Sequence, residues 1–208
     1  MYVPDAFRID DRTLLFAHAK AHPFATVITH GDDGVAVSHL PLLVDGSKGV
    51  LRGHLARENP QLSHLAAGGD ALTIFHGPHA YVSPSVYLEH PSVPTWNYVA
   101  VHARGPARIV SETDLRAMVD DMVVHFDTTG WRMEAGEDFR RSMLDRIAGF
   151  EIRIQHVEGK WKLSQNHPVE RQAKVIAALE RQGGEDAKEI AALMRERLHG
   201  LKLEPGAR

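Results

Sequence analysis

Short apolar runs that alternate with polar positions, or that are rich in β-branched residues, recur along most of the chain, and this pattern is typical of β-strands. The turn Gly31-Asp32-Asp33-Gly34 lies between two such runs and predicts a hairpin. We expect His76–His79 to break one strand, Gly105-Pro106 to interrupt another, and Glu158-Gly159 to form a turn. The predicted strands cover residues 24–29, 35–40, 41–44, 50–55, 70–75, 80–82, 96–110, 150–154 and 160–163.

Apolar positions spaced three or four residues apart predict helices between and after these strands. The first helix has Asp10 or Asp11 as its N-cap and is stopped by Pro23. Ser111 and Asp114 have the form of a capping box at the start of a later helix. The predicted helices cover residues 11–22, 58–65, 112–126, 136–146, 169–182 and 185–198.

The order of these elements restricts the fold. Many short strands joined by turns favour a closed or partly closed barrel, and helices that do not alternate regularly with strands argue against a doubly wound sheet. The predicted class is therefore α+β, mainly β, with peripheral helices and a C-terminal helical tail. We predict a barrel domain over residues 1–167 and a helical extension over residues 168–208.

Composition restricts the class of protein, its location and its partners. The chain has 208 residues, of which 43% are hydrophobic and 25% are charged, as in an ordinary globular protein. It has no apolar stretch of membrane-spanning length, no secretory pattern in its first residues and no cysteine, so we expect a cytoplasmic protein without a membrane partner. The formal net charge of −3 argues against a dedicated nucleic-acid binder, although a local basic patch is compatible with it.

Polar clusters near strand ends supply the first candidate sites. The segment 53–60 places Arg57 where a strand gives way to a helix, which suits a phosphate-bearing ligand. A capped helix beside a solvated arginine is the alternative interpretation. In the segment 76–84, Tyr81 and Ser83 alternate onto one face, where they line a ligand site or form the polar surface of a β-bulge.

An aromatic segment and a polar turn complete the candidates. Trp96, Asn97 and Tyr98 can stack on a planar ring and hydrogen-bond its edges, or they can form core or dimer contacts. The segment 160–166 ends a strand with consecutive hydroxyl and amide side chains. These could close a ligand pocket or form an ordinary polar turn.

Metal and nucleotide motifs are missing from the sequence. There is no His-Glu-x-x-His, P-loop, Gly-x-Ser-x-Gly or Gly-x-Gly-x-x-Gly pattern. His18 and His22 have the i,i+4 spacing of a chelating pair, but no acidic residue lies between them, so we interpret them as a solvated helix face and predict no metal site. A haem could use any one of the 14 histidines as its axial ligand.

Ordered motifs along the chain resemble those of the PaiB family, which is known as a family of FMN-binding negative transcriptional regulators. The resemblance extends from residue 1 to about residue 180. One departure is Val86, which stands where the family usually has tryptophan and removes aromatic surface from a stacking or interface contact. The matching segments are Met1–Phe7, Pro23–Thr26, Ser38–Leu42, Gly53–Pro60, Gly77–Pro84, Val93–Tyr98 and Lys162–Asn166.

The resemblance implies an FMN-binding split β-barrel, similar to pyridoxamine-phosphate oxidase-like proteins, and a homodimer with the flavin at the subunit interface. It implies that His54 and Arg57 bind the phosphate, and that Trp96, Asn97 and Tyr98 come from the second subunit. The predicted cofactor-binding residues are Ser38, His39, His54, Arg57, Tyr81, Ser83, Trp96, Asn97, Lys162, Ser164 and Gln165.

The family also implies a negative regulator of transcription, with DNA as a partner. The sequence shows no clear helix-turn-helix, and the balanced charges of the two tail helices favour a packed or dimer-bracing hairpin. Alternatives are a flavin-dependent oxidoreductase, a haem-binding relative of the same fold, or a cofactor-free dimeric binding module. The sequence leaves open whether the protein is an enzyme.

Overall fold

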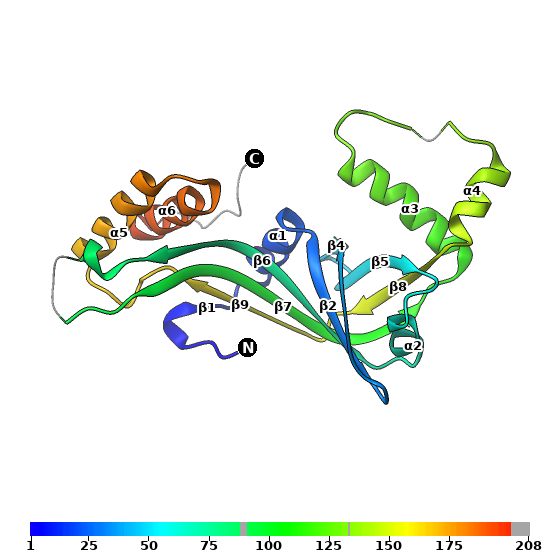
Figure 1. Cartoon of the computed structure of the whole chain (residues 1–208), viewed down its shortest axis with the longest axis horizontal. Helices are drawn as coiled ribbons and strands as arrows, with labels where there is room; N and C mark the ends of the chain where they lie inside the picture. Colours follow the sequence, from blue (N-terminus) through cyan, green and yellow to red (C-terminus); the bar gives the residue numbers. More distant parts are fainter. Residues whose placement is uncertain (88–90, 133, 201–208) are drawn as a thin grey trace. The chain divides into compact units, whose positions relative to one another are not determined.

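The computed structural model describes residues 1–87, 91–132 and 134–200 (Figure 1). The strands in this part of the chain are β1 (Arg8–Ile9), β2 (Phe24–Gly31), β3 (Gly34–Pro41), β4 (Leu43–Asp45), β5 (Val50–Ala56), β6 (Asp70–Val82), β7 (Thr95–Ile109), β8 (Ile147–Arg153) and β9 (His156–Lys162). The α-helices are α1 (Arg12–Ala21), α2 (Gln61–Ala66), α3 (Glu112–Phe126), α4 (Glu137–Leu144), α5 (Val169–Gln182) and α6 (Glu185–Leu198), and the 3-10 helices are η1 (Asp5–Phe7) and η2 (Pro84–Val86).

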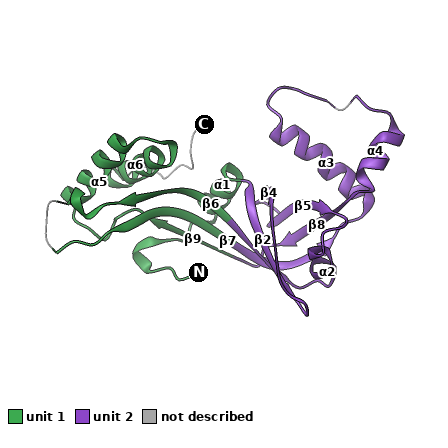
Figure 2. Ribbon diagram, in the orientation of Figure 1, with its two compact units in different colours: residues 1–22, 75–102, 157–208 green, residues 23–74, 103–156 purple. Residues whose placement is uncertain are grey.

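The strands pair in the order β3-β2-β6-β7-β8-β5-β4, and β9 pairs with both β1 and β7. Every pairing whose register is described is antiparallel. The predicted class, α+β and mainly β, is therefore confirmed. The chain forms two compact units (Figure 2). The predicted division at residue 167 stays a prediction.

Unit 2 comprises residues 23–74 and 103–156. Alternation along β5 directs Leu51, Gly53 and Leu55 to the inner face of its sheet. A Cβ at Gly53 would lie 2.5 Å from a methyl carbon of Leu42, so glycine is needed for this close packing. On the outer side, α3 buries an apolar stripe in a cluster of Leu43, Leu115, Met118, Met122 and Leu144.

Unit 1 comprises residues 1–22, 75–102 and 157–208. The described residues of this unit are 1–22, 75–87, 91–102 and 157–200. Its core includes the fully buried side chains of Trp161, Phe75 and Leu163. Helices α5 and α6 form a packed pair, with apolar residues such as Leu179 and Ile190 buried. The predicted helical hairpin is confirmed, with the residue bounds that the sequence indicated.

Two predicted strand breaks, at His76–His79 and at Glu158-Gly159, are wrong, because glycines there allow close packing instead of turning the chain. β6 continues through Gly77, where a Cβ would lie 2.4 Å from the His18 ring. The long strand predicted over residues 96–110 is confirmed as β7, which runs through Gly105, where a Cβ would lie 1.9 Å from the Arg153 carbonyl oxygen. β9 continues through Gly159, which pairs with Ile9 of β1 and approaches a Leu15 methyl group.

Helix starts agree well with the capping signals. Asp11, not Asp10, caps α1, because its carboxylate accepts hydrogen bonds from the backbone N–H groups of Thr13 and Leu14. The Ser111 hydroxyl accepts a hydrogen bond from the Asp114 backbone N–H at 3.1 Å, as the capping box predicts. Among the helices in the described ranges, none is long and apolar enough to cross a membrane.

Candidate functional site

The predicted phosphate-binding segment lies in unit 2, at the end of β5. His54 alternates with Gly53 and Leu55, so its side chain lies on the opposite face of β5, the face on which Arg52 pairs with Asp121 of α3. The His54 ring is half-buried, and its Nδ1 is buried with no hydrogen-bond partner in the described structure. Burial lowers the pKa of His54, so the ring is neutral near neutral pH and keeps one nitrogen as an acceptor.

Arg57 follows β5 directly and is exposed. Its guanidinium Nε donates to the Asp145 carbonyl oxygen at 2.8 Å, and Nη2 donates to the Ile147 carbonyl oxygen at 3.1 Å. A guanidinium has five N–H donors, so these bonds fix its plane and leave donors for an anion. A cavity of about 270 Å³ lies beside Arg57, with Val110 and Glu112 among its lining residues.

Ser38 and His39 are neighbours on β3 and therefore point to opposite faces of the sheet. The Ser38 hydroxyl accepts a hydrogen bond from Asn59 Nδ2 at 3.1 Å, which ties β3 to the start of α2. His39 is exposed and its Nδ1 lies 3.0 Å from the Thr26 hydroxyl of β2. A ligand on the exposed face of the hairpin would meet His39 and not Ser38.

A buried polar network behind this hairpin was missed by the sequence analysis. Gln61, the first residue of α2, is 1% exposed, and its Nε2 donates to the Thr29 hydroxyl at 3.1 Å. His64 Nδ1 lies 3.0 Å from the same hydroxyl, and His64 Nε2 lies 2.5 Å from Asp33 Oδ1. The hydrogen bond with His64 lowers the pKa of Asp33. The glutamine after Asn59-Pro60 was the only sequence signal, because the partners are far apart along the chain.

In unit 1, Tyr81 and Trp96 form an exposed aromatic pair. Their side chains are 43% and 52% exposed, and their ring centroids lie 5.7 Å apart in an edge-to-face arrangement. The His79 ring also lies near Trp96, with ring centroids 6.0 Å apart. Ser83 caps the short η2 helix through a bond from the Ser85 backbone N–H. The two exposed rings can stack on a planar ligand.

The remaining candidates in unit 1 are largely engaged within the protein. Asn97 is fully buried and its Nδ2 donates to the Ser164 hydroxyl at 3.0 Å. Lys162 Nζ donates to the Trp96 carbonyl oxygen at 2.9 Å, and burial, with a smaller effect from Lys160, lowers its pKa. Gln165 closes its own turn by donating to the Trp161 carbonyl oxygen at 2.5 Å and accepting from the Leu163 backbone N–H at 2.6 Å.

Ser164 has a positive φ of 60°, in the left-handed region that non-glycine residues rarely adopt. The bond from Asn97 holds this conformation. Asn97 and Ser164 therefore shape the turn that follows β9, and a direct contact with a ligand would require them to leave the core.

The interpretation of His18 and His22 as a solvated face is wrong for His18. This residue is 2% exposed and its ring packs on Trp161 at 5.1 Å between centroids. Burial, with a smaller effect from the charge of His22, lowers the pKa of His18 to about 3. Within the described residues, no group of three or more His, Cys, Asp or Glu side chains could hold a metal ion.

Three kinds of comparison relate this geometry to known proteins. A family model described as "Putative FMN-binding domain" matches residues 1–156. The "Protease synthase and sporulation protein PAI 2" of Bacillus subtilis is 32% identical over 204 residues, which are 95% of this chain and 98% of that protein. The uncharacterized protein AN0679 of Emericella nidulans is 31% identical over 77% of this chain and 81% of its own length.

Solved structures show the same fold at low sequence identity. The FAD and haem binding protein of Mycobacterium smegmatis has a TM-score of 0.61 and 18% identity, covering 86% of this chain and 80% of that one. The flavocytochrome Anf3 of Azotobacter vinelandii has a TM-score of 0.60 and 14% identity, covering 74% of this chain and 69% of that one. The predicted split-barrel fold is confirmed.

The residues present fit the groups of a flavin. His54 Nδ1 is a buried polar atom that lacks a partner among the described residues, and Arg57 has unused donors for a phosphate. Tyr81 and Trp96 offer exposed ring surface that can contact a planar heterocycle. The donors in unit 2 suit an anionic, hydrogen-bonding group, and the rings in unit 1 suit an aromatic one.

Proposed function

Because the chain belongs to the PaiB family of FMN-binding split-barrel proteins, we propose that it binds FMN as a homodimer and represses transcription. Flavin binding is supported by the family model over residues 1–156. The observation that carries the proposal for this chain is the unpartnered, buried Nδ1 of His54 close in sequence to the exposed guanidinium of Arg57.

FMN is favoured over larger cofactors because Arg57 is the one arginine among the predicted cofactor-binding residues. One arginine with free donors matches one terminal phosphate, which it can bind with two parallel hydrogen bonds. Neutral His54 can satisfy its buried nitrogen with a ligand hydroxyl or phosphate oxygen. When bound, FMN would supply redox chemistry, and the protein would supply position and electrostatics.

The homodimer is supported by an exposed apolar face on the β2–β3 hairpin. Cross-strand neighbours share a face, and the register pairs Phe24 with Pro41, Thr26 with His39, and Ile28 with Val37. Phe24 is 65% exposed and Val37 is 52% exposed, so this sheet face presents large apolar side chains to solvent. A second copy covering this face would also cover His39.

Cofactor titration tests the first step. We expect the purified protein to show flavin absorbance, or to bind added FMN saturably and more tightly than FAD or haem. His54→Leu should weaken FMN binding, because it removes the buried nitrogen, whereas His125→Gln on the exposed side of α3 should not change it. A colourless protein that binds none of the three cofactors would refute flavin binding.

Light scattering tests the dimer. Val37→Glu should produce a monomer with weakened FMN binding, because it places a charge in the middle of the apolar face. Val169→Glu is the matched control, since Val169 is 60% exposed at the start of α5. A monomeric wild-type protein, or a Val37→Glu variant that remains dimeric, would contradict the proposal.

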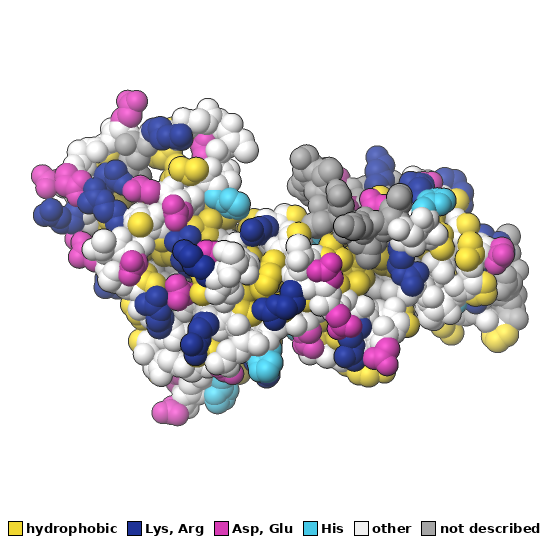
Figure 3. All heavy atoms as spheres, turned by 180° about the vertical axis from the view of Figure 1, so that it is seen from behind, with side chains coloured by type: hydrophobic (Ala, Val, Ile, Leu, Met, Phe, Trp, Pro, Cys, Tyr) yellow, Lys and Arg dark blue, Asp and Glu magenta, His cyan; other side chains and the backbone are white. Residues whose placement is uncertain are grey.

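Repression of transcription is supported by the family membership. The surface charge adds no support, because cationic and anionic side chains are interspersed on the face shown in Figure 3. The test is an electrophoretic shift with DNA from the region upstream of the protein's own gene, at several salt concentrations. Binding should weaken steeply with salt, because phosphate neutralisation releases counterions. Absence of a shift at low salt, together with turnover of a reduced nicotinamide by the flavoprotein, would favour an oxidoreductase instead.

A further inference from the structure

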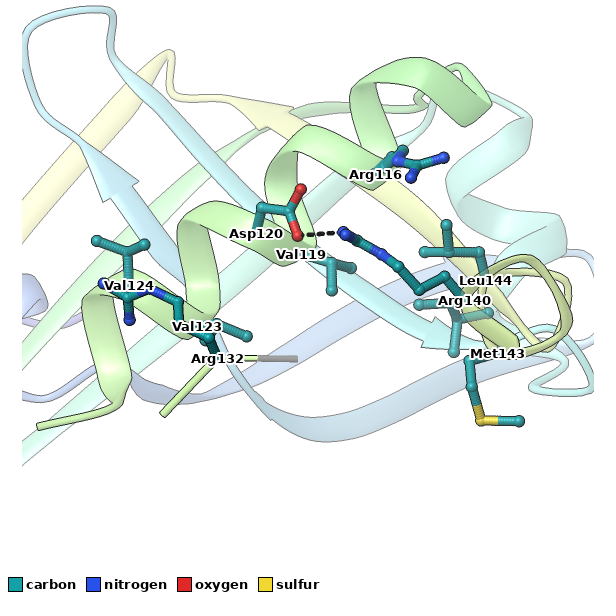
Figure 4. Close-up of a pocket in the computed structure, with 10 residues that line it drawn as sticks. Arg116, Val119, Asp120, Val123, Val124, Arg132, Arg140, Met143 and Leu144 are labelled. Carbon is teal, nitrogen blue, oxygen red and sulfur yellow. Dashed lines mark hydrogen bonds and ion pairs between the residues drawn. The ribbon is translucent and has the colours of Figure 1, made fainter. Parts of the chain in front are cut away.

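A cavity of about 340 Å³ lies in unit 2 between α3 and α4 (Figure 4). Its apolar lining consists of Val119, Val123, Val124, Met143, Leu144 and Ile147. The volume lies near the lower end of small-molecule pockets, which span about 300–1,000 Å³. None of the residues that the sequence analysis assigned to the flavin lines this cavity.

Core packing explains part of the apolar lining, because Leu144 belongs to the core cluster and Val119 and Ile147 pack against it, but it does not explain Val123, Val124 and Met143. Met118 and Met122 form the core-facing stripe of α3, and both are buried in the cluster beneath the helix. Val119 and Val123 lie one position further round the helix and face the cavity. Val124, also at the cavity, is 68% exposed, so α3 has a second apolar stripe that no described residue covers fully.

Three arginines line the cavity, and two of them are neutralised by acids. Arg140 Nη2 lies 2.6 Å from Asp120 Oδ1 (Figure 4), and Arg116 pairs with Glu137 through both carboxylate oxygens.

The third arginine, Arg132, differs from the other two. It donates to the Trp131 carbonyl oxygen at 3.0 Å and has no acidic partner among the described residues. The cavity therefore combines an apolar lining with one uncompensated positive charge.

We propose that this cavity binds a compact aliphatic monocarboxylate. The alkyl tail would lie against Val119, Val123 and Leu144, where removing its methylenes from water favours binding. The carboxylate would take a fork of hydrogen bonds from Arg132, a geometry that the planar guanidinium favours. A single free cation matches one negative charge, which disfavours polyanions.

Titration calorimetry with octanoate and with octanol tests the proposal on the full-length protein. We expect saturable octanoate binding, about fivefold tighter than octanol binding, because a partly exposed ion pair adds a modest amount to the apolar contact. The octanoate affinity should fall with added salt while the octanol affinity should not. Absence of saturable octanoate binding would overturn the proposal, as would equal affinity for the two probes.

Two variants assign the binding to this cavity. Arg132→Gln should abolish the preference for octanoate and leave octanol binding unchanged, whereas Arg141→Gln, an exposed cation of α4 outside the lining, should preserve the preference. Val123→Asp should abolish binding of both probes. The cavity would instead be an interface between copies of this chain if Val124→Glu turned a dimer into a monomer and the wild type bound no octanoate.

Discussion

Acidification should destabilise the fold through His18, which is buried in unit 1 against Trp161. Burial is the larger cause of its lowered pKa, and the charge of His22, whose ring centroid lies 4.3 Å away, is the smaller cause. The folded protein therefore holds His18 neutral at a pH where the unfolded chain protonates it. The unfolded state binds more protons between the two pKa values, so stability falls as pH decreases through this window.

The size of the effect follows from the two pKa values. The ordinary histidine value is 6.5 and the folded value is about 3. Lowering the pH from about 7 to about 4.5 should then remove about 2.5 kcal/mol of unfolding free energy through His18 alone. For a protein of this size, that corresponds to a fall of about 5–10 °C in the unfolding midpoint.

Urea unfolding at several pH values measures this contribution as a difference between proteins. Between about pH 7 and about pH 4.5, the unfolding free energy of His18→Leu should fall by about 2.5 kcal/mol less than that of the wild type, because the leucine cannot titrate. His156→Gln, at the exposed start of β9, should keep the wild-type pH dependence. Identical pH dependence in His18→Leu and the wild type would refute the reasoning.

Three further predictions concern contacts that the structure shows directly. Gly77→Ala should lower the unfolding free energy, measured by denaturation, by about 1–3 kcal/mol, because a Cβ would lie 2.4 Å from the His18 ring. Gly69→Ala is the control: its Cβ would lie 3.9 Å from the nearest atom, so the unfolding free energy should change by less than about 0.5 kcal/mol. Asn97→Ala should lower the unfolding free energy by about 1–3 kcal/mol, because it leaves the buried Ser164 hydroxyl without its partner. An unchanged unfolding midpoint would contradict a stabilising role for this hydrogen bond. His64→Leu should raise the pKa of Asp33 toward its ordinary value, which carboxyl NMR titration would detect.

Local chemistry made many elements predictable from the sequence. The bounds of α5 and α6 follow from an apolar period and from Gly183-Gly184, both of which have positive φ in the structure. The Ser111 cap of α3 and the Gly31–Gly34 hairpin turn were predicted for the same reason. These features depend on neighbours within a few positions, which the sequence displays directly.

The candidate site was only partly predictable. The sequence identified Arg57, Tyr81 and Trp96 as candidate ligand-binding groups near strand ends, and the structure finds them exposed. It did not reveal that Asn97 and Ser164 are buried against each other, because their pairing joins positions that are 67 residues apart. A polar side chain in a short motif looks the same whether it faces a ligand or the core.

The sequence by itself determined the elements, their mainly β character and the family, because periodicity, caps and motifs are local or linear properties. Tertiary structure decided which glycines continue strands and which histidine is buried. Gly77 and Gly159 resemble strand breaks until the atoms packed against them are known. His18 is buried because β6 and Trp161 pack against its helix, and such long-range packing leaves no periodic signal in the chain.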